Sequence, residues 1–161
     1  MKYVLFLVVA LAVLGLARIR LAGDDVAVWH VDPSVVEPGA RRNDFLMRTG
    51  DGDADSAVFA MEGAELAGIF DEYALSRPRV TRLAGTPDQL WLTYIQRSKW
   101  FGFPDYISVR ISPVEGGHSG LTIYSRARYG GSDLGVNRAR VTGWIEGLRS
   151  IEAAQPAVPA D

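Results

Sequence analysis

The chain contains no cysteine, two histidines and two lysines. The lack of cysteine excludes disulfide bonds, thiol catalysis and cysteine-bound zinc, and it is compatible with any redox compartment. With two histidines, a histidine-rich metal centre is not expected, and no cofactor is expected either. Because lysine is so scarce and no known nucleic-acid-binding module is recognisable, we expect no nucleic-acid partner.

Motifs of hydrolytic catalysis are missing as well. The sequence has no Gly-x-Ser-x-Gly elbow and no clustered pair of carboxylates. Ser98 and Ser125 each adjoin an arginine. Either serine would need His30 or His118 within hydrogen-bond reach. His118 stands in a glycine-containing loop, which is a poor support for a rigid base. We therefore assign no catalytic residue, and a serine–histidine hydrolase is the less favoured alternative.

Residues 51–62 have part of the spacing of an EF-hand calcium loop. Counting from Asp51, carboxylates follow at positions 3, 5 and 12, as in that motif. Position 6, where the tight turn requires glycine, is occupied by Ser56. No clear helix precedes the segment either. We interpret it as an acidic surface loop and predict no metal site.

The formal net charge of −2 hides an uneven distribution. Residues 24–72 hold twelve acidic and three basic side chains, a balance of −9. Residues 77–149 hold eleven basic and five acidic side chains, a balance of +6. The simplest account is that the two halves face each other in the fold. The alternative is an exposed basic face for an anionic partner.

Residues 1–22 read as a transmembrane anchor or a signal segment. An apolar run at 3–17 is followed by Arg18 and Arg20, and it reaches the ~20 residues of a membrane span if these arginines snorkel towards the head groups. An arginine just after the small-residue site disfavours cleavage as a signal peptide. We favour an uncleaved anchor with a periplasmic domain. A cleaved secreted form and a cytoplasmic domain, which the positive-inside rule favours, stay open.

Residues 23–56 form a lead-in that is rich in proline, glycine and aspartate. Trp29 stands out in it, because a tryptophan in such a segment usually packs back on the domain. We therefore expect the lead-in to pack on the domain as an extended strap. His30 beside Asp32 has the residue types of a catalytic pair or metal ligand, but a capped turn before Pro33 is the favoured interpretation.

Hydrophobic periodicity predicts the order β-α-β-β-β-β-α within a domain at residues 57–151. The predicted strands are 58–60, 80–84, 89–97, 106–112 and 121–128, and the predicted helices are 63–75 and a second one from an N-cap at Ser132 to 148. Short links between the last four strands imply an antiparallel meander of four to five strands. Two helices with one apolar stripe each cover one face, which gives a two-layer α+β fold. We expect a disordered tail at 152–161.

The stretch 121–148 carries the candidate site. Along the strand, Arg126 and Arg128 project from the face opposite to the core. Along the helix, the stripe of Leu134, Val141, Ile145 and Leu148 forces Asn137 or Arg138 towards the buried side. A buried polar group needs partners. We predict one polar cluster, either an internal clamp or an anion-binding pocket, made of Arg97, Arg126, Arg128, Asp133, Asn137 and Arg138.

The same stretch, SRARYGGSDLGVNRARV, together with TYIQRS at 93–98 and GFPDYISVR at 102–110, resembles the DUF1499 family of bacterial proteins. The resemblance extends over residues 58–148, and SDLGVNR is its specific part. It implies no activity that can be transferred. Many relatives have a cysteine-containing segment near the start of the domain, so any role of that segment is absent here.

These observations favour a membrane-tethered binding or accessory domain. Its expected working surface is an exposed sheet face that carries Arg97, Arg110, Arg126, Arg128, Trp91, Tyr106 and Tyr124. Arginines between aromatic rings suit an anionic or amphipathic ligand, or a protein partner in the envelope. A purely structural subunit of an envelope complex is the alternative, ahead of the hydrolase.

Overall fold

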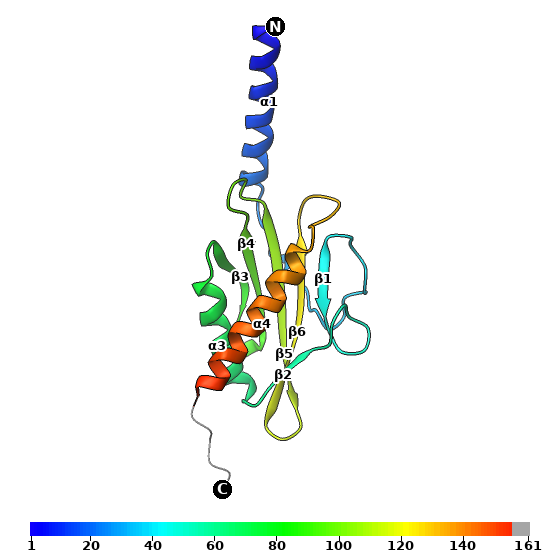
Figure 1. The fold of residues 1–161 in the computed structure, drawn as a ribbon, viewed down its shortest axis with the longest axis vertical. Coiled ribbons are helices and arrows are strands. Elements are labelled where there is room, and N and C mark those ends of the chain that lie inside the picture. The colour runs from blue at the N-terminus through cyan, green and yellow to red at the C-terminus, as the bar shows by residue number, and fades with distance from the viewer. Residues whose placement is uncertain (156–161) are drawn as a thin grey trace.

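The computed structural model describes residues 1–155 and has an antiparallel sheet with two long helices on one of its faces (Figure 1). The strands are β1 (Asp44–Met47), β2 (Ala57–Phe59), β3 (Val80–Thr86), β4 (Trp91–Arg97), β5 (Pro104–Val114) and β6 (His118–Ala127). The helices are α1 (Lys2–Leu21), α2 (Val26–Trp29), α3 (Gly63–Ser76), the short 3-10 helix η1 (Pro87–Gln89) and α4 (Val136–Ala154).

Strands β3 to β6 form the predicted meander, because each is antiparallel to the next along the chain. The sheet order is β1-β6-β5-β4-β3, and β2 pairs with the same strand β6 as β1 does. The α+β class, the antiparallel meander and the preceding apolar helix are therefore confirmed. Strand β1 was not predicted, because it is four residues long and lies in a segment dominated by turn-forming residues.

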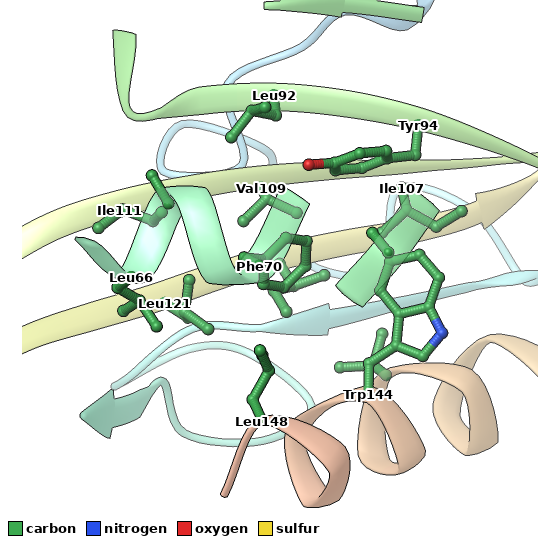
Figure 2. Packing of buried hydrophobic residues seen from close by; sticks show 14 of the residues in the cluster. Leu66, Phe70, Leu92, Tyr94, Ile107, Val109, Ile111, Leu121, Trp144 and Leu148 are labelled. Carbon is green, nitrogen blue, oxygen red and sulfur yellow. The ribbon is translucent and has the colours of Figure 1, made fainter. Parts of the chain in front are cut away.

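The main core lies between the sheet and the helices α3 and α4 (Figure 2). On α3, Leu66, Phe70 and Ala74 are fully buried at helical spacing. On α4, Trp144 packs edge-on against Phe70, with ring centroids 5.8 Å apart. Each such large apolar side chain contributes about 1.5–3 kcal/mol by leaving water. This packing fixes both helices to the same face of the sheet.

The second face of the sheet is covered by the first part of the lead-in. The ring of Trp29 stacks on Tyr106 with centroids 3.8 Å apart and an interplanar angle of 6°. His30 stacks on Trp91 at 3.9 Å, and the indole N–H of Trp91 donates to the carbonyl of Val31 at 3.2 Å. The strap therefore covers the centre of the face for which the sequence predicts exposure, while Arg97 and Arg110 towards the ends of the strands stay about one third exposed.

The acidic and basic halves of the sequence meet as expected. Four ion pairs join them: Asp71–Arg82, Asp24–Arg97, Asp32–Arg110 and Asp24–Arg128. Three of these four pairs hold the lead-in against the sheet. The uneven charge along the sequence thus supports the attachment of the strap.

Helix α4 begins later than predicted. Its first residue is Val136, and both Leu134 (φ 53°) and Gly135 (φ 81°) have left-handed backbone conformations that stop the helix from starting at Ser132. Leu134 is consequently 93% exposed and does not belong to the apolar stripe. At its other end α4 continues to Ala154, so the predicted tail is wrong for 152–154, and residues 156–161 lie outside the described part of the chain.

Helix α1 extends away from the domain as a separate rod (Figure 1). It has 20 residues, none of them buried, so its length is about 30 Å at ~1.5 Å per residue. It is long and apolar enough to cross a membrane, and a signal sequence would show the same features.

Candidate functional site

The structure does not bring the six predicted site residues into one cluster. Asp133 and Asn137 lie on the helix-covered face of the sheet, where Asn137 contacts Ser125. Side chains that alternate along a strand point to opposite faces. The opposite face, which the strap covers, therefore carries Arg97 of β4, Arg126 of β6 and Arg128, which follows β6. The sheet separates these arginines from Asp133 and Asn137. Arg138 belongs to neither group: it is exposed, with its guanidinium 4.6 Å from the ring centre of Phe45.

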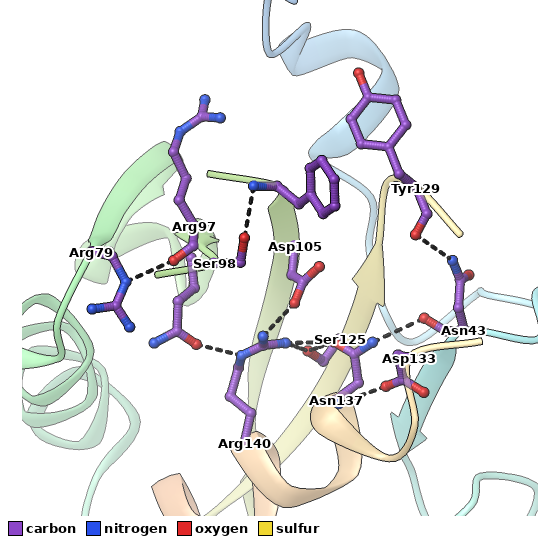
Figure 3. A network of polar contacts seen from close by, with 12 residues as sticks. Asn43, Arg79, Arg97, Ser98, Asp105, Ser125, Tyr129, Asp133, Asn137 and Arg140 are labelled. Carbon is purple, nitrogen blue, oxygen red and sulfur yellow. Dashed lines mark hydrogen bonds and ion pairs between the residues drawn. The ribbon is translucent and has the colours of Figure 1, made fainter. Parts of the chain in front are cut away.

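Asn137 is the centre of the cluster on the helix side, and it is fully buried (Figure 3). Its amide oxygen accepts from the Ser125 hydroxyl at 2.7 Å, and its amide nitrogen donates to the carbonyl of Asn43 at 2.9 Å. The carboxylate of Asp133 accepts from the backbone N–H of Asn137 at 2.6 Å, which satisfies a free donor in the first turn of α4. These contacts connect the start of α4 to β6 and to the lead-in.

Arg140, rather than Arg138, is the arginine of this cluster. Its guanidinium donates to the amide oxygen of Asn137 at 2.5 Å and to Ser125 at 3.0 Å, and it forms an ion pair with Asp105. Burial raises the pKa of Asp105, and the charge of Arg140 opposes that rise. Helical spacing could have identified Arg140 from the sequence, because this residue lies one turn after Asn137 on the same side of α4.

This cluster fits the clamp interpretation. Within residues 1–155, every buried side-chain nitrogen or oxygen atom has a hydrogen-bond partner. The buried polar groups around Asn137 therefore satisfy one another. The cluster positions α4 against β6.

Arg126 is the buried charge of the strap-covered face, with 2% of its surface exposed. It donates to the carbonyl of Trp29 and, at 3.2 Å, to the Ser108 hydroxyl. The rings of Tyr124 and Tyr106 lie within 6 Å of its guanidinium carbon. Burial lowers the pKa of Arg126 to about 10. The part of the expected binding surface around Arg126, Tyr106 and Tyr124 is thus a packed interior.

Arg97 and Arg128 share Asp24, at the start of the lead-in. Arg97 is 2.6 Å and Arg128 3.5 Å from its carboxylate oxygens. The hydroxyl of Tyr106 also donates to this carboxylate, at 2.5 Å. Burial, reinforced by Asp24, raises the pKa of Tyr106 to about 12. Two of the predicted ligand-binding arginines therefore hold the strap.

Of the two histidines, His30 forms a hydrogen bond with a hydroxyl group. Its Nδ1 is 2.8 Å from the Thr93 hydroxyl, which is 3.0 Å from that of Ser108. Both hydroxyls are fully buried, so a substrate would have to displace the strap to reach them. In the described part of the chain, neither Ser98 nor Ser125 has a histidine partner. The two serines considered for hydrolysis therefore form no pair with a base.

The acidic loop after β1 uses its carboxylates internally. Asp51 forms an ion pair with Arg48 at 2.7 Å, and Asp53 accepts from the backbone N–H of Leu46 at 2.8 Å. Over residues 1–155 there is no group of three or more histidine, aspartate or glutamate side chains placed to hold a metal ion.

A different site, which we call the basic pocket, lies where α1 meets the edge of the sheet. It has a volume of about 490 Å³ and is lined by Arg20, Arg79, Thr81, Arg97, Ser98, Lys99 and Gly102. These residues come from the last turn of α1, from β3 and its preceding turn, and from the end of β4 with the loop after it. Of this set, the sequence analysis assigns only Arg97 to a binding site, because Arg20 and Arg79 are far from it along the chain and only the fold brings them together.

Arg79 occupies a strained position beside this pocket. Pro78 and Arg79 are the central residues of a turn in which the N–H of Val80 donates to the carbonyl of Arg77 at 3.3 Å. Arg79 has φ 60°, a value that the third position of a type II turn requires and that glycine or asparagine usually supplies. The left-handed conformation costs an arginine about 1–2 kcal/mol. Its side chain is exposed and donates to the carbonyl of Arg97 at 2.9 Å (Figure 3).

The basic pocket carries positive charge that nearby carboxylates do not neutralise. Arg97 is paired with Asp24. Arg20, Arg79 and Lys99 have no carboxylate within 4.0 Å among residues 1–155. Guanidinium groups present N–H donors in a planar fork that matches phosphate and carboxylate oxygens. The pocket is chemically suited to an anion.

Comparison with known proteins gives a family match over most of the domain. The family described as "Protein of unknown function (DUF1499)" matches residues 49–148. A search of the curated proteins found no match. The matched region contains the sheet from β2 to β6, both core helices except for the last residues of α4, and most of the basic pocket.

Proposed function

We propose that this chain, which belongs to the DUF1499 family, is a membrane-tethered binding domain whose basic pocket holds the phosphate group of an anionic lipid. Helix α1 is the tether. The pocket opens beside its last turn, where the head groups of a crossed bilayer would lie. The domain binds its ligand and does not transform it.

The observation that carries the proposal is the group of unneutralised cations at one end of the domain. Arg20, Arg79 and Lys99 converge there on one pocket, and Ser98 and Thr81 add hydroxyl groups to its wall. Each basic residue near an anionic membrane surface contributes about 1 kcal/mol of attraction. A guanidinium adds directed hydrogen bonds to phosphate oxygens. The strained backbone of Arg79 supports the same conclusion, because left-handed non-glycine residues concentrate at functional positions.

Membrane tethering is supported by the length of α1 and by the charges at its ends. A helix of about 30 Å matches the hydrocarbon thickness of a bilayer. Arg18 and Arg20 in its last turn would reach the head groups, as arginines at helix ends do. We propose that the domain is periplasmic, although Arg18 and Arg20 by themselves favour the cytoplasmic side under the positive-inside rule, so the side of the membrane is tested directly.

A cysteine-labelling experiment tests both the tether and its orientation. The chain has no cysteine, so Glu115→Cys in the exposed β5–β6 loop creates a single labelling site. A membrane-impermeant maleimide applied to intact cells should label a periplasmic domain. Labelling only after lysis would place the domain in the cytoplasm, and recovery of a form lacking α1 would show that α1 is a cleaved signal sequence.

Thermal unfolding of the full chain in nanodiscs tests the ligand. Phosphatidylglycerol discs should raise the melting temperature over phosphatidylcholine discs, because a ligand present at ~100 times its Kd stabilises the folded state by about 2.7 kcal/mol. The double variant Arg79→Asn/Lys99→Gln should lose this rise. Asparagine tolerates the left-handed turn position, so the variant should fold. Arg149→Gln, which removes an exposed charge paired with Glu152, is the matched control.

The outcomes separate the sources of phosphate. An equal rise on adding inorganic phosphate to phosphatidylcholine discs would show that a free anion is sufficient. Equal melting temperatures of the wild type in both discs, without a phosphate effect, would refute the pocket as an anion site. A rise that the double variant retains would place the lipid contact elsewhere on the protein.

A further inference from the structure

The aromatic loop, residues 98–103, connects β4 to β5 at the end of the domain where α1 joins it (Figure 1). Trp100 is 75% exposed and Phe101 is 54% exposed. Beyond α1, these are the exposed aromatic side chains in the part of the chain that the structure describes. Two neighbouring large apolar side chains at a loop tip indicate contact with an apolar partner.

The backbone of the aromatic loop is fixed by its own hydrogen bonds. The N–H of Ser98 donates to the carbonyl of Phe103 at 2.9 Å, and the N–H of Phe103 donates to the Ser98 hydroxyl at 3.0 Å. Gly102 has φ 70° and donates to the carbonyl of Ser98 at 3.1 Å. The loop is therefore a preformed turn that holds its two aromatic side chains outward.

Arg20 ties this loop to α1. Its guanidinium donates to the carbonyl of Phe101 at 3.2 Å and to that of Trp100 at 3.1 Å. On the apolar side of the same junction, Phe101 and Phe103 line a groove of about 500 Å³ together with α1 residues between 9 and 19. The loop thus lies alongside the last part of the apolar helix.

The position of the groove determines which partner fits. If α1 crosses a bilayer, its 20 residues occupy the whole hydrocarbon thickness. A side chain beside residues 16–19, near the end of the helix, then lies in the bilayer close to its surface. Phe101 is such a side chain. Tryptophan is enriched at membrane interfaces, and Lys99, with its ammonium 5.0 Å from the ring centre of Trp100, suits an anionic surface.

We propose that the aromatic loop inserts Trp100 and Phe101 into the interface of the bilayer that α1 crosses, and thereby fixes the domain against the membrane. This inference depends on the tether in the proposed function. It adds a second membrane contact, which would hold the basic pocket at the level of the head groups. The partner is the lipid surface.

The neighbouring β6–α4 loop, residues 128–135, extends the same surface. Tyr129 in this loop packs near Phe103, with ring centroids 6.0 Å apart, and both loops lie at the α1 end of the domain (Figure 1). Leu134 in this loop is 93% exposed in a left-handed conformation. An exposed, strained leucine has no stabilising role in the folded domain, and contact with lipid would bury it.

Tryptophan quenching by brominated lipids tests the insertion on the full chain. The protein is reconstituted into phosphatidylcholine–phosphatidylglycerol vesicles with bromine on the acyl chains close to the head group. The other three of the four tryptophans, at 29, 91 and 144, are buried or half-buried in the domain. Because Trp100 alone should reach the lipid, the brominated lipids should lower the total tryptophan emission by roughly one quarter. Trp100→Phe should reduce this quenching by about fivefold or more.

A second reporter separates this proposal from the tether. Phe6→Trp in the Trp100→Phe background places a tryptophan within α1. Quenching at position 6 without quenching of Trp100 would leave the tether intact and overturn the insertion. Lack of quenching at both positions would overturn both proposals. Protection of Trp100 from lipid together with a dimer in the vesicles would assign the loop to a second copy of the chain, which also overturns the insertion.

Discussion

Replacing Asn137 with alanine tests the clamp between α4 and β6. The substitution removes three contacts: acceptance from Ser125 at 2.7 Å, acceptance from Arg140 at 2.5 Å, and donation to the Asn43 carbonyl at 2.9 Å. Two of them are neutral hydrogen bonds and one is charge-assisted. The site is fully buried, so water cannot replace the lost partners without a rearrangement.

The expected cost follows from the partners that remain. Neutral hydrogen bonds contribute about 0.5–1.5 kcal/mol each and charged ones about 1.5–3 kcal/mol, which sets an upper limit near ~6 kcal/mol for the three contacts. Ser125 and Arg140 stay bonded to each other at 3.0 Å, and the Asn43 carbonyl keeps the N–H of Ala127 at 3.0 Å. We therefore expect Asn137→Ala to lower the free energy of unfolding by about 3 kcal/mol. For a domain of this size, that corresponds to a melting temperature lower by roughly 10 °C.

The assay is urea unfolding of the full chain in detergent, followed by tryptophan fluorescence. The transition midpoint should fall while the slope m stays unchanged, because the surface exposed on unfolding is the same. Arg138→Ala is the matched control on the next residue. It removes an exposed cation–π contact with Phe45, which contributes about 0.5–1 kcal/mol. Equal costs for the two variants, or an Asn137→Ala cost below about 0.5 kcal/mol, would refute the clamp.

Two further predictions concern the strap and the packing of the helices. Burial, reinforced by Arg126, lowers the pKa of His30 below 6.5, so the unfolded chain takes up a proton that the folded chain refuses. The free energy of unfolding should therefore fall as the pH drops from about 6.5 towards the pKa of His30 in the folded state. Urea titrations at several pH values measure this dependence, and His30→Gln should weaken it. The same pH dependence in the variant as in the wild type would show that His30 is not its source. A Cβ at Gly147 would lie 2.1 Å from the Tyr73 hydroxyl, whereas one at Gly143 meets nothing within 4 Å. Gly147→Ala should therefore destabilise the domain by about 1–2 kcal/mol, whereas Gly143→Ala should stabilise it by up to ~1 kcal/mol. Thermal unfolding measures both effects. A change of the same sign in both variants would contradict the packing of α3 on α4.

Local patterns predicted the elements that have strong periodicity. The alternation along β6 correctly placed Ser125 and Arg126 on opposite faces, and the short links between strands correctly gave the meander. The same alternation should have separated Arg126 from Asn137. Grouping them was wrong because both were chosen for closeness in sequence, whereas the sheet lies between them.

The missed features depend on contacts that periodicity does not encode. Arg140 was passed over for Arg138, because the apolar stripe alone does not show which polar neighbour finds a carboxylate such as Asp105. The helix start was placed too early because nothing in the sequence marks Leu134 as left-handed. Trp29 indicates that the lead-in packs on the domain, but nothing in the sequence gives its path over the arginine-bearing face, so the sequence alone predicts that this face is exposed.

The basic pocket is a stronger example of a feature that the local sequence pattern does not predict. Its cations come from residue 20, from residue 79 and from residues 97–99, and only the fold brings them together. The sequence indicated an excess of basic residues after residue 77, and the ion pairs with the lead-in use part of it. The part that stays unneutralised lies next to α1.

The measurement that tests the central claim most directly is native mass spectrometry of the full chain released from nanodiscs of mixed phosphatidylcholine and phosphatidylglycerol. Masses of the complexes with one retained lipid identify the class of lipid that the protein holds. We expect phosphatidylglycerol to be enriched in these complexes for the wild type and for Arg149→Gln, and the enrichment to disappear in Arg79→Asn/Lys99→Gln. Retention of the two lipids in proportion to their abundance in the disc would contradict an anionic lipid site in the basic pocket.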